Sequence, residues 1–295
     1  MSAPWLSVVV ASVNGLPYLD ACLEALERHA PGAELIVADW TDERTRERVR
    51  ERYPGVRLLS FDDPMTVPEL RAAGIFAATA PYVAVIEDHC NVTRDWAAGA
   101  VAAHEAGHAV VGGPVRNVVT RRSRDWAPFF CEYSSFMEPL PEGPVDDLPG
   151  MNVSYDRRAL EAMDDLVRQG RWESDLHPRL RDADLSFWCA RAMTIEHAKD
   201  FGFREFASQR YHYSRSYAGM LNESLGAKRW LYAAGSPLLV LISFFRILRN
   251  VRMRPSAAKH FRRATPLIAA YCAIWAYGEF VGYVFGGGRS ILKVR

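Results

Sequence analysis

The chain lacks the cysteine pattern of a disulfide scaffold or a zinc ribbon. Its five cysteines are an odd number, and no two of them form a Cys-x-x-Cys pair. Such scattered cysteines are typical of reduced thiols and indicate a cytoplasmic catalytic domain. The first fifteen residues also lack a basic segment, and their apolar stretch is short and β-branched. We therefore interpret this stretch as a first strand and not as a signal peptide.

The chain also lacks a large net charge of either sign. The chain has 36 basic and 35 acidic residues, which argues against a protein that mainly binds nucleic-acid phosphates. The sum conceals an asymmetry, because residues 246–295 hold ten basic residues and one acidic residue. The two parts of the chain are therefore expected to face different partners. With 49% hydrophobic residues, the composition is that of a folded protein.

The two commonest phosphate-binding motifs are also absent. Neither a GxGxxG fingerprint nor a GxxxxGK[ST] loop follows the first apolar run. Because these glycine-rich loops cradle the phosphates in dinucleotide-binding and P-loop proteins, both classes are excluded. A nucleotide would need a site of another kind.

The N-terminal part does contain a regular alternation of apolar runs and helical patterns. Apolar runs typical of buried strands lie at residues 6–11, 34–38, 56–61, 82–86 and 109–115. Segments with helical spacing lie at residues 19–29, 41–53, 67–78 and 95–104. This order predicts an α/β fold with a mostly parallel central sheet flanked by helices. Residues 120–150 contain five prolines and are predicted to form a long ordered loop.

The C-terminal part is more apolar. Residues 230–245 are sixteen residues without a charge, and residues 264–288 are twenty-five residues with Glu279 as their one charge. Both runs approach the length of a membrane span. A spanning hairpin would place the basic residues between them outside the cell, against the positive-inside tendency. We predict two in-plane or re-entrant helices held against anionic headgroups, with a helical subdomain packed on the core as the alternative.

Four stretches of the chain, in this order, resemble those of the family 2 glycosyltransferases. They are SVVVASVNGLPYLDACLEAL, LIVADWTDERT, VPELRAAGIFAATAPYVAVIEDH, and LPGMNVSYDRRAL followed by WESDLHPRL. The likeness covers about residues 5–215. It implies a GT-A fold and transfer of a sugar, with inversion, from a nucleotide-sugar donor to an acceptor hydroxyl.

The resemblance implies a donor site near the ends of the early strands. Asn14 and Asp39 would lie near the nucleotide, with Asp39 accepting a hydrogen bond from the base. Trp40 stands where the family has a second aspartate, which is a departure from its pattern. Arg71 would meet a phosphate, and Arg210 would close the donor site.

The resemblance also implies a metal site. The triplet from Glu87 to His89 follows an apolar run, and the carboxyl ends of strands are where open α/β sheets bind ligands. In register with the family's DxD motif, Glu87 and His89 take the outer positions, while Asp88 adds to the donor site. His197 resembles the later histidine that completes the metal shell. Because an imidazole is present, Mn²⁺ is favoured over Mg²⁺.

The segment WESDLHPRL aligns with the family's catalytic-base segment. The alignment places Glu173 at the general base and Asp175 as its acidic neighbour. This chemistry needs a carboxylate that takes the proton of the acceptor hydroxyl. The preceding segment places Gly150, Met151 and Asn152 on the acceptor side.

One motif indicates another class of protein. HEAGH at residues 104–108 is a literal HExxH, in which a helix would place two histidines on one face for zinc. Gly107 weakens the helix end, and AVVGGP follows, so we expect these histidines at a helix end and in the loop after it. A zinc metallopeptidase stays as an alternative. A non-catalytic nucleotide-sugar-binding scaffold is another, because the metal and base motifs both depart from the family.

The sequence thus predicts a metal-dependent glycosyltransferase with a GT-A domain at residues 1–215 and a membrane-associating helical region at residues 216–295. Its partners would be a nucleotide-sugar donor and the cytoplasmic face of the cell membrane. A membrane tether raises the local concentration near lipid-linked or amphipathic acceptors, so an acceptor of that kind is expected.

Overall fold

The computed structural model describes residues 4–294, which divide into two compact units. The sheet unit comprises the residues up to Val118 together with Phe136–Lys199. The helical unit comprises Val119–Ser135 and the residues from Asp200 onward.

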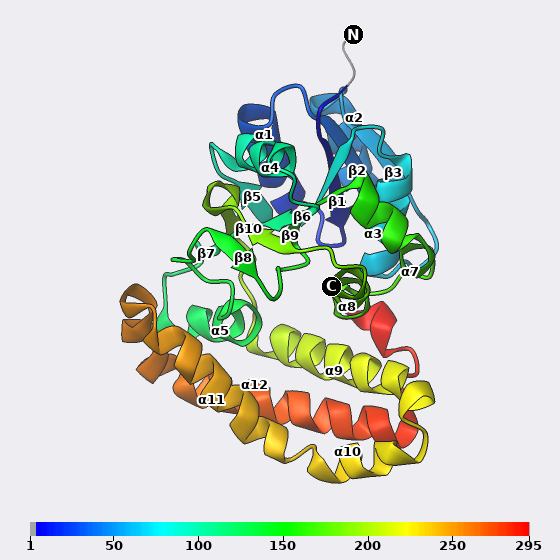
Figure 1. Cartoon of the computed structure of the whole chain (residues 1–295). Coiled ribbons are helices and arrows are strands. Elements are labelled where there is room, and N and C mark those ends of the chain that lie inside the picture. The colour runs from blue at the N-terminus through cyan, green and yellow to red at the C-terminus, as the bar shows by residue number, and fades with distance from the viewer. Residues whose placement is uncertain (1–3, 295) are drawn as a thin grey trace. The chain divides into compact units, whose positions relative to one another are not determined.

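An eight-stranded sheet forms the core of the sheet unit, in the order β3-β2-β1-β4-β9-β6-β10-β8 (Figure 1). Its strands are β1 (Ser7–Ser12), β2 (Glu34–Asp39), β3 (Arg57–Ser60), β4 (Tyr82–Glu87), β6 (Val110–Gly112), β8 (Gly143–Val145), β9 (Asn152–Asp156) and β10 (Phe187–Cys189). The first four strands are parallel, whereas β9 is antiparallel to both of its neighbours. The predicted α/β fold with a mostly parallel sheet is confirmed.

Helices cover both faces of this sheet. Helices α1 (Tyr18–His29) and α4 (Trp96–Glu105) belong to one buried cluster, which also holds Val8 and Val10 of β1. Helices α3 (Val67–Ala77) and α8 (Glu173–Asp182) belong to a second cluster, which holds Val9. Alternate residues of a strand point to opposite faces, so β1 contributes to both clusters. The unit is completed by α2 (Glu43–Arg52), α6 (Arg157–Ala162) and α7 (Asp164–Arg168).

The predicted strand at residues 109–115 is in fact two strands in different sheets. β6 ends at Gly112, and β7 (Val115–Asn117) joins a three-stranded sheet with β5 (Cys90–Val92) and β11 (Ile195–His197). The break falls at Gly113 and the proline after it. A Cβ on Gly113 would lie 2.3 Å from the carbonyl oxygen of Met193, so the backbone passes too closely for any other residue.

The prediction of a long loop at residues 120–150 is wrong in part. It contains a short 3₁₀ turn, then α5 (Trp126–Tyr133), and later β8. Pro128 lies in the first turn of α5, where a backbone N–H has no partner within the helix, so this proline does not prevent a helix. Phe129 and Phe130 are buried, which stabilises the helix by packing that the local sequence does not reveal.

Four further helices form most of the helical unit. They are α9 (Phe203–Leu225), α10 (Arg229–Gly235), α11 (Leu238–Arg252) and α12 (Pro255–Phe285). Small residues let α12 lie close against α9: a Cβ on Gly278 would be 2.0 Å from Ser214 Oγ, and one on Gly282 would be 2.5 Å from the carbonyl oxygen of Arg215.

Two parts of the helical unit have the length and composition of membrane segments. By these measures α12 can cross a membrane, although half of its most apolar stretch is buried in the protein. The α10 and α11 region passes the same test as a pair of helices bent by 68°. The predicted long apolar helix in the C-terminal region is therefore present.

Candidate active site

The carboxylate of Asp88 shapes the turn between β1 and α1. Its Oδ2 accepts hydrogen bonds from the backbone N–H groups of Val13 (3.0 Å), Asn14 (2.6 Å) and Gly15 (3.0 Å). Its Oδ1 accepts from Asn14 Nδ2 at 2.7 Å. Burial alone would raise the pKa of Asp88, but the His89 ring and the Asn14 hydrogen bonds hold it below the ordinary value. Two predicted donor-site residues, Asn14 and Asp88, thus lie together as each other's partners.

Asp39 ends β2, and its carboxylate is completely buried. Oδ1 accepts hydrogen bonds from Ser12 Oγ at 2.8 Å and Thr41 Oγ1 at 2.7 Å. Oδ2 accepts from the Thr41 N–H at 3.3 Å and from Arg46 Nε at 3.1 Å. A carboxylate offers about four lone-pair positions. Donors of the protein therefore occupy all four acceptor positions of the Asp39 carboxylate. A nucleotide base would have to displace one of them.

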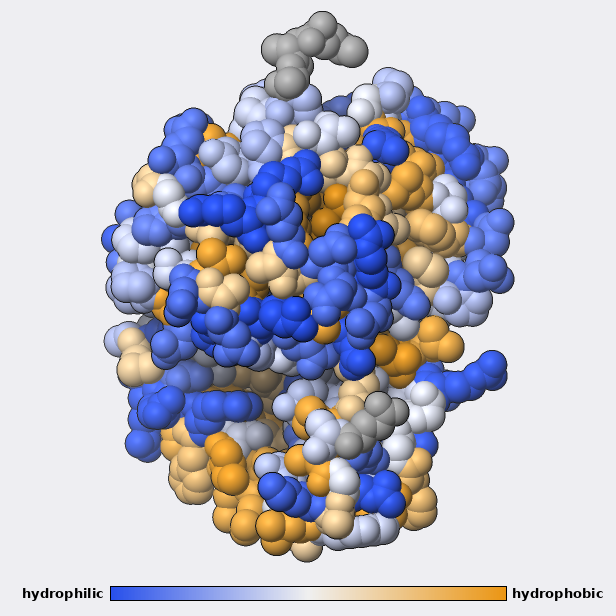
Figure 2. Space-filling view, turned by 45° about the vertical axis from the view of Figure 1, so that its right-hand side comes forward, coloured by the Kyte–Doolittle hydropathy of each residue, from blue (hydrophilic) through white to orange (hydrophobic). Residues whose placement is uncertain are grey.

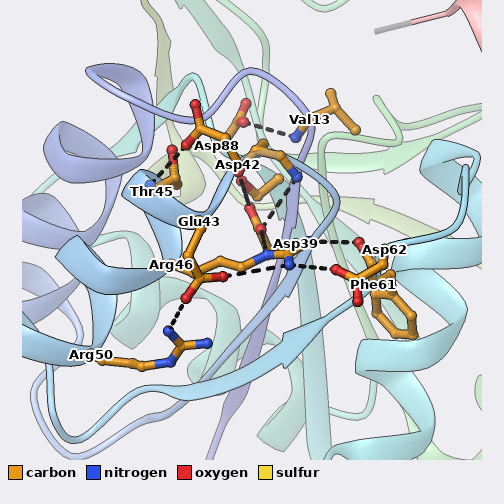
Figure 3. Close-up of polar contacts among 12 residues, drawn as sticks. Val13, Asp39, Asp42, Glu43, Thr45, Arg46, Arg50, Phe61, Asp62 and Asp88 are labelled. Carbon is orange, nitrogen blue, oxygen red and sulfur yellow. Dashed lines mark hydrogen bonds and ion pairs between the residues drawn. The ribbon is translucent and has the colours of Figure 1, made fainter.

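Arg46 is the cationic partner of Asp39 (Figure 3). The guanidinium extends from α2 and is nearly buried. Its Nη1 pairs with Asp62 at 2.7 Å, and its Nη2 donates to the carbonyl oxygen of Phe61 at 2.6 Å. Asp62 is exposed, with 94% of its side chain accessible. Arg46 thereby ties the end of β2 to the segment that follows β3.

Arg71 joins two segments that lie far apart in the sequence. The guanidinium extends from α3, pairs through Nη2 with Glu87 at the end of β4, and pairs through Nη1 with Glu173 at the start of α8. Burial alone would lower the pKa of Arg71, but the carboxylates of Glu173 and Glu87 raise it. The predicted phosphate ligand, the predicted metal ligand and the predicted base therefore form one largely buried cluster.

The predicted acceptor segment reaches this cluster through Gly150. A Cβ at that position would lie 2.3 Å from Glu173 Cδ, so the carboxylate packs directly on the glycine backbone. Asn152, in contrast, has its amide inside the core. It accepts from Trp96 Nε1 at 2.8 Å and donates to the carbonyl oxygen of Met193 at 2.7 Å. Met151 is buried as well.

Asp175 lies one residue beyond Ser174 in the first turn of α8. Burial raises the pKa of this carboxyl, and Arg171, at 3.9 Å, opposes the rise. A carboxyl group with a raised pKa is better suited to proton transfer near neutral pH. The two carboxylates differ in environment. Glu173 is paired with the buried Arg71, whereas Asp175 lies 3.9 Å from Arg171.

The predicted metal ligands lie near one another but do not form a closed set. Glu87 Oε2 is 3.5 Å from His89 Nε2, and the rings of His89 and His197 meet edge to face with centroids 4.8 Å apart. Within residues 4–294, no three or more His, Cys, Asp or Glu side chains are arranged to hold a metal ion. One carboxylate and one imidazole nevertheless fit a divalent cation that takes its other ligands from diphosphate oxygens and water.

A hydrogen-bonded chain that the sequence analysis missed leads to the same place. Tyr155 lines a recess together with Arg71 and Glu173, and its hydroxyl is 3.3 Å from His177 Nε2. His177 Nδ1 lies 2.6 Å from Asp147 Oδ1. An ionised carboxylate can only accept, so Nδ1 is the nitrogen that donates to Asp147, and Nε2 is the one that faces the Tyr155 hydroxyl. The one signal in the sequence is the position of His177, four residues after Glu173 and hence on the same helical face.

Arg210 belongs to the helical unit. It lies on α9 with its guanidinium 3.9 Å from the centroid of a Trp275 ring and 3.9 Å from Glu132 Oε1. Its role at the donor site stays a prediction.

The HExxH motif does not form a zinc site. α4 ends at Glu105, so His108 lies beyond the helix and the two histidines do not share a helical face. His104 uses both ring nitrogens inside the fold, at 2.8 Å from the carbonyl oxygen of His108 and 2.8 Å from Ser154 Oγ. The metallopeptidase alternative is therefore wrong, and the reason is the helix end that Gly107 and the following strand impose.

Comparison with known proteins identifies the family. Residues 7–163, more than half of the chain, match the sequence model of glycosyl transferase family 2. The chain belongs to this family. The prediction of a nucleotide-sugar-dependent glycosyltransferase is thereby confirmed. A search of curated protein sequences found no match.

Solved structures of other glycosyltransferases share the fold. One is a mannosyltransferase from Pyrobaculum calidifontis in complex with GDP-mannose and Mn²⁺, with a TM-score of 0.56, 13% identity, and coverage of 95% of this chain and 88% of that chain. Another is GalNAc-T7 with UDP, GalNAc and Mn²⁺, with a TM-score of 0.52, 14% identity, and coverage of 68% of this chain and 45% of that one. At such identities the likeness concerns the GT-A fold alone, which agrees with the family membership.

Proposed function

We propose that this glycosyltransferase uses Glu173 as the general base for transfer with inversion from a nucleoside-diphosphate sugar to an acceptor hydroxyl. The observation that carries the proposal is Arg71, which bridges Glu173 to Glu87, the first residue of the DxD-like motif at the end of β4. One guanidinium thus links the place where a diphosphate would leave to the carboxylate that would take the acceptor proton.

Donor binding would change what Arg71 contacts. Without a ligand, its guanidinium pairs with Glu87 and Glu173. A diphosphate competes for it, because arginine binds phosphate oxygens through two parallel hydrogen bonds. If Arg71 turns to the phosphate, Glu173 is released to accept the proton of the acceptor hydroxyl. Activation of the base would then follow donor binding.

Glu87 and His89 would hold a divalent cation, Mn²⁺ in preference to Mg²⁺, with His197 beside His89. When bound, such an ion stabilises the negative charge that develops on the departing diphosphate. The proposal rests on the donor types and on the 3.5 Å separation of Glu87 Oε2 and His89 Nε2. Asn14 would lie at the donor phosphates through the turn that Asp88 holds.

A thermal-stability titration tests the donor site. Full-length protein is mixed with nucleoside diphosphates of each base, with and without Mn²⁺, and the unfolding temperature is measured. A ligand that binds the native state alone raises this temperature, so one base should give a shift that depends on Mn²⁺. If no nucleotide shifts the unfolding temperature with or without Mn²⁺, the proposed donor site is refuted.

Replacement of Glu173 tests the base. Glu173→Gln should lower transfer from the nucleotide-sugar identified in the titration by about 10²- to 10⁴-fold while nucleotide binding persists, because a general base contributes rate enhancements of that order. Glu161→Gln, the same change at an exposed position on α6, is the matched control and should keep full activity. Full turnover by Glu173→Gln would remove Glu173 from the mechanism.

The proposed acceptor is lipid-linked or amphipathic, and the proposed location is the cytoplasmic face of the cell membrane. The support is the length and apolar character of α12 and of the α10 and α11 pair. With a radiolabelled donor, the sugar should appear in the lipid-extractable fraction of added membranes. Transfer confined to water-soluble acceptors would contradict this part of the proposal.

A further inference from the structure

Helix α11 has the reverse of the distribution expected for a helix on a water-exposed surface. Its exposed side carries Leu238, Leu241, Ile242 and Phe245, with exposed fractions of 62%, 57%, 56% and 59%. These positions follow the spacing of one helical face. On a soluble surface, a contiguous group of large apolar side chains of this kind marks a contact site.

The opposite side of α11 contains polar groups that are buried and bonded. Asn250 is 7% exposed and its Nδ2 donates to Ser134 Oγ at 3.4 Å. Arg254, just after the helix, donates to the carbonyl oxygen of Asn250 at 2.8 Å and to that of Ser135 at 3.2 Å. These bonds fix which side of α11 faces the protein, so the apolar side faces outward.

Helix α10, which precedes α11, also carries large exposed apolar residues. Trp230, Leu231 and Tyr232 are exposed by 53%, 73% and 48%. Figure 2 shows hydrophobic residues gathered on the surface of the helical unit. Trp and Tyr are the side chains that favour the boundary between water and lipid. The bend of 68° between α10 and α11 prevents the pair from acting as one straight span.

Basic residues accompany this apolar surface. Arg246, Arg249 and Arg252 on α11 are exposed, and the helix contains no acidic residue. Arg249 and Arg252 fall in the last turn, beyond the four apolar residues along the same helix. Arginines beside an apolar face complement the negative headgroups of an anionic bilayer.

Helix α12 is less suited to be the lipid contact, although it is the longer apolar helix. It packs against α5, α9, α10 and α11, and its most apolar stretch is 50% buried. It also carries Glu279, which is 7% exposed and accepts from Trp275 Nε1 at 2.5 Å and Tyr283 OH at 3.1 Å. α12 is thus the central helix of the unit. α11, with 15 residues, is about 22 Å long, which is short of a bilayer core.

We propose that the outer face of α10 and α11, named here the apolar face, lies in the plane of an anionic phospholipid surface. The apolar face consists of Trp230, Leu231, Leu238, Leu241, Ile242 and Phe245. These side chains enter the boundary between headgroups and acyl chains, and Arg249 and Arg252 pair with lipid phosphates. The inference rests on the membrane location proposed above and specifies its surface, its orientation and its lipid charge.

Sedimentation with vesicles tests the apolar face in the full-length protein. We expect binding to vesicles of phosphatidylcholine with phosphatidylglycerol, and weaker binding to phosphatidylcholine alone. Phe245→Glu should weaken vesicle binding by about tenfold or more, because it removes a large apolar side chain from the lipid contact and adds a negative charge. The matched control is Phe76→Glu on α3, the same change at a phenylalanine that is 45% exposed, and it should bind vesicles like the wild type.

A charge variant tests the lipid specificity. Arg249→Gln with Arg252→Gln should weaken binding to the anionic vesicles by roughly fivefold per arginine at low salt and leave binding to neutral vesicles unchanged. Alkaline carbonate should release the bound protein, because the helices do not cross the bilayer. Resistance to carbonate would overturn the in-plane orientation.

Three outcomes separate this inference from its alternatives. Unchanged vesicle binding by both Phe245→Glu and Leu241→Glu refutes the apolar face. A dimer in the absence of lipid that Phe245→Glu converts to a monomer, without vesicle binding by either form, would show that a second copy covers the face. The nucleotide-dependent rise in unfolding temperature is measured on every variant, so a failure of the donor site is distinguished from a failure of the membrane contact.

Discussion

At the scale of single residues, four carboxylates near the carboxyl edge of the sheet differ in what they bind. Asp39 is saturated by Ser12, Thr41 and Arg46, and Asp88 is bonded to the backbone of the β1 to α1 turn. Glu87 and Glu173 share Arg71 instead. Asp39 and Asp88 therefore stabilise the backbone around the site. Glu87 and Glu173 share the Arg71 guanidinium, for which a phosphate can compete.

Removal of Arg71 should be costly for stability. Arg71→Met leaves two largely buried carboxylates without their shared cation, and we expect a loss of about 3 kcal/mol in the free energy of unfolding. Arg168→Met is the control, because it breaks a solvent-exposed pair with Asp164 and should cost at most about 1 kcal/mol. Urea unfolding of both variants measures this, and equal losses would contradict the buried bridge.

Asp88 should contribute stability that depends on pH. Its folded pKa lies below the ordinary value of 3.8, so its contribution is fully present above that value and is lost as the pH falls through the lower folded pKa. Asp88→Asn should cost about 2–3 kcal/mol at neutral pH, since three backbone N–H groups lose a charged acceptor. Denaturation across the acidic range, with the exposed Asp182→Asn as control, should show the difference shrinking below pH 3.8. A difference that does not depend on pH would refute this role.

At the scale of elements, packing between neighbours explains where local patterns were misleading. Prolines indicated a loop at residues 120–150, yet Pro128 is accommodated in the first turn of α5. The run at residues 109–115 looked like one strand, yet Gly113 lies so close to Met193 that the chain changes sheet. In both places, contacts with distant segments override the local pattern.

The contact between α9 and α12 should tolerate no added methyl group. A Cβ at position 278 would lie 2.0 Å from Ser214 Oγ and 2.7 Å from the carbonyl oxygen of Tyr211, so Gly278→Ala should lose about 1–3 kcal/mol. Gly235→Ala, at the end of α10 with nothing within 4 Å, should be neutral or gain up to about 1 kcal/mol. Thermal unfolding distinguishes the two, and a Gly278→Ala protein as stable as the wild type would show that the helices are farther apart.

At the scale of the whole molecule, the two units have separate cores and different chemistry. The sheet unit contains Arg71, Glu87 and Glu173, and the helical unit contains α10 and α11 with their exposed apolar residues. The residues before position 246 are net acidic, and those from 246 onward are net basic. This difference agrees with two units that bind different partners.

Scanning calorimetry should resolve the two units. Because each unit has a core of its own, we expect two unfolding transitions and not one. The nucleoside diphosphate identified in the titration, together with Mn²⁺, should raise the transition of the sheet unit by several degrees and leave the other nearly unchanged. A single transition that shifts as a whole would contradict independent units.

The sequence by itself determined the alternation of strands and helices, the parallel sheet and the family. These follow from residue periodicity and from short motifs, which depend on neighbours a few positions apart. The predicted positions of Glu87 and Glu173 also came from such motifs. The apolar character of the C-terminal helices was likewise readable from composition.

The tertiary structure alone decided how these residues are used. It paired Arg71 with carboxylates that lie 16 and 102 positions away in the sequence. It placed the Arg46 guanidinium against the Asp39 carboxylate, and it connected Tyr155 through His177 to Asp147. It also turned the apolar side of α11 outward. Such choices depend on which buried polar groups find partners across the fold. Burial without a partner is costly, and sequence spacing does not record which distant segments meet.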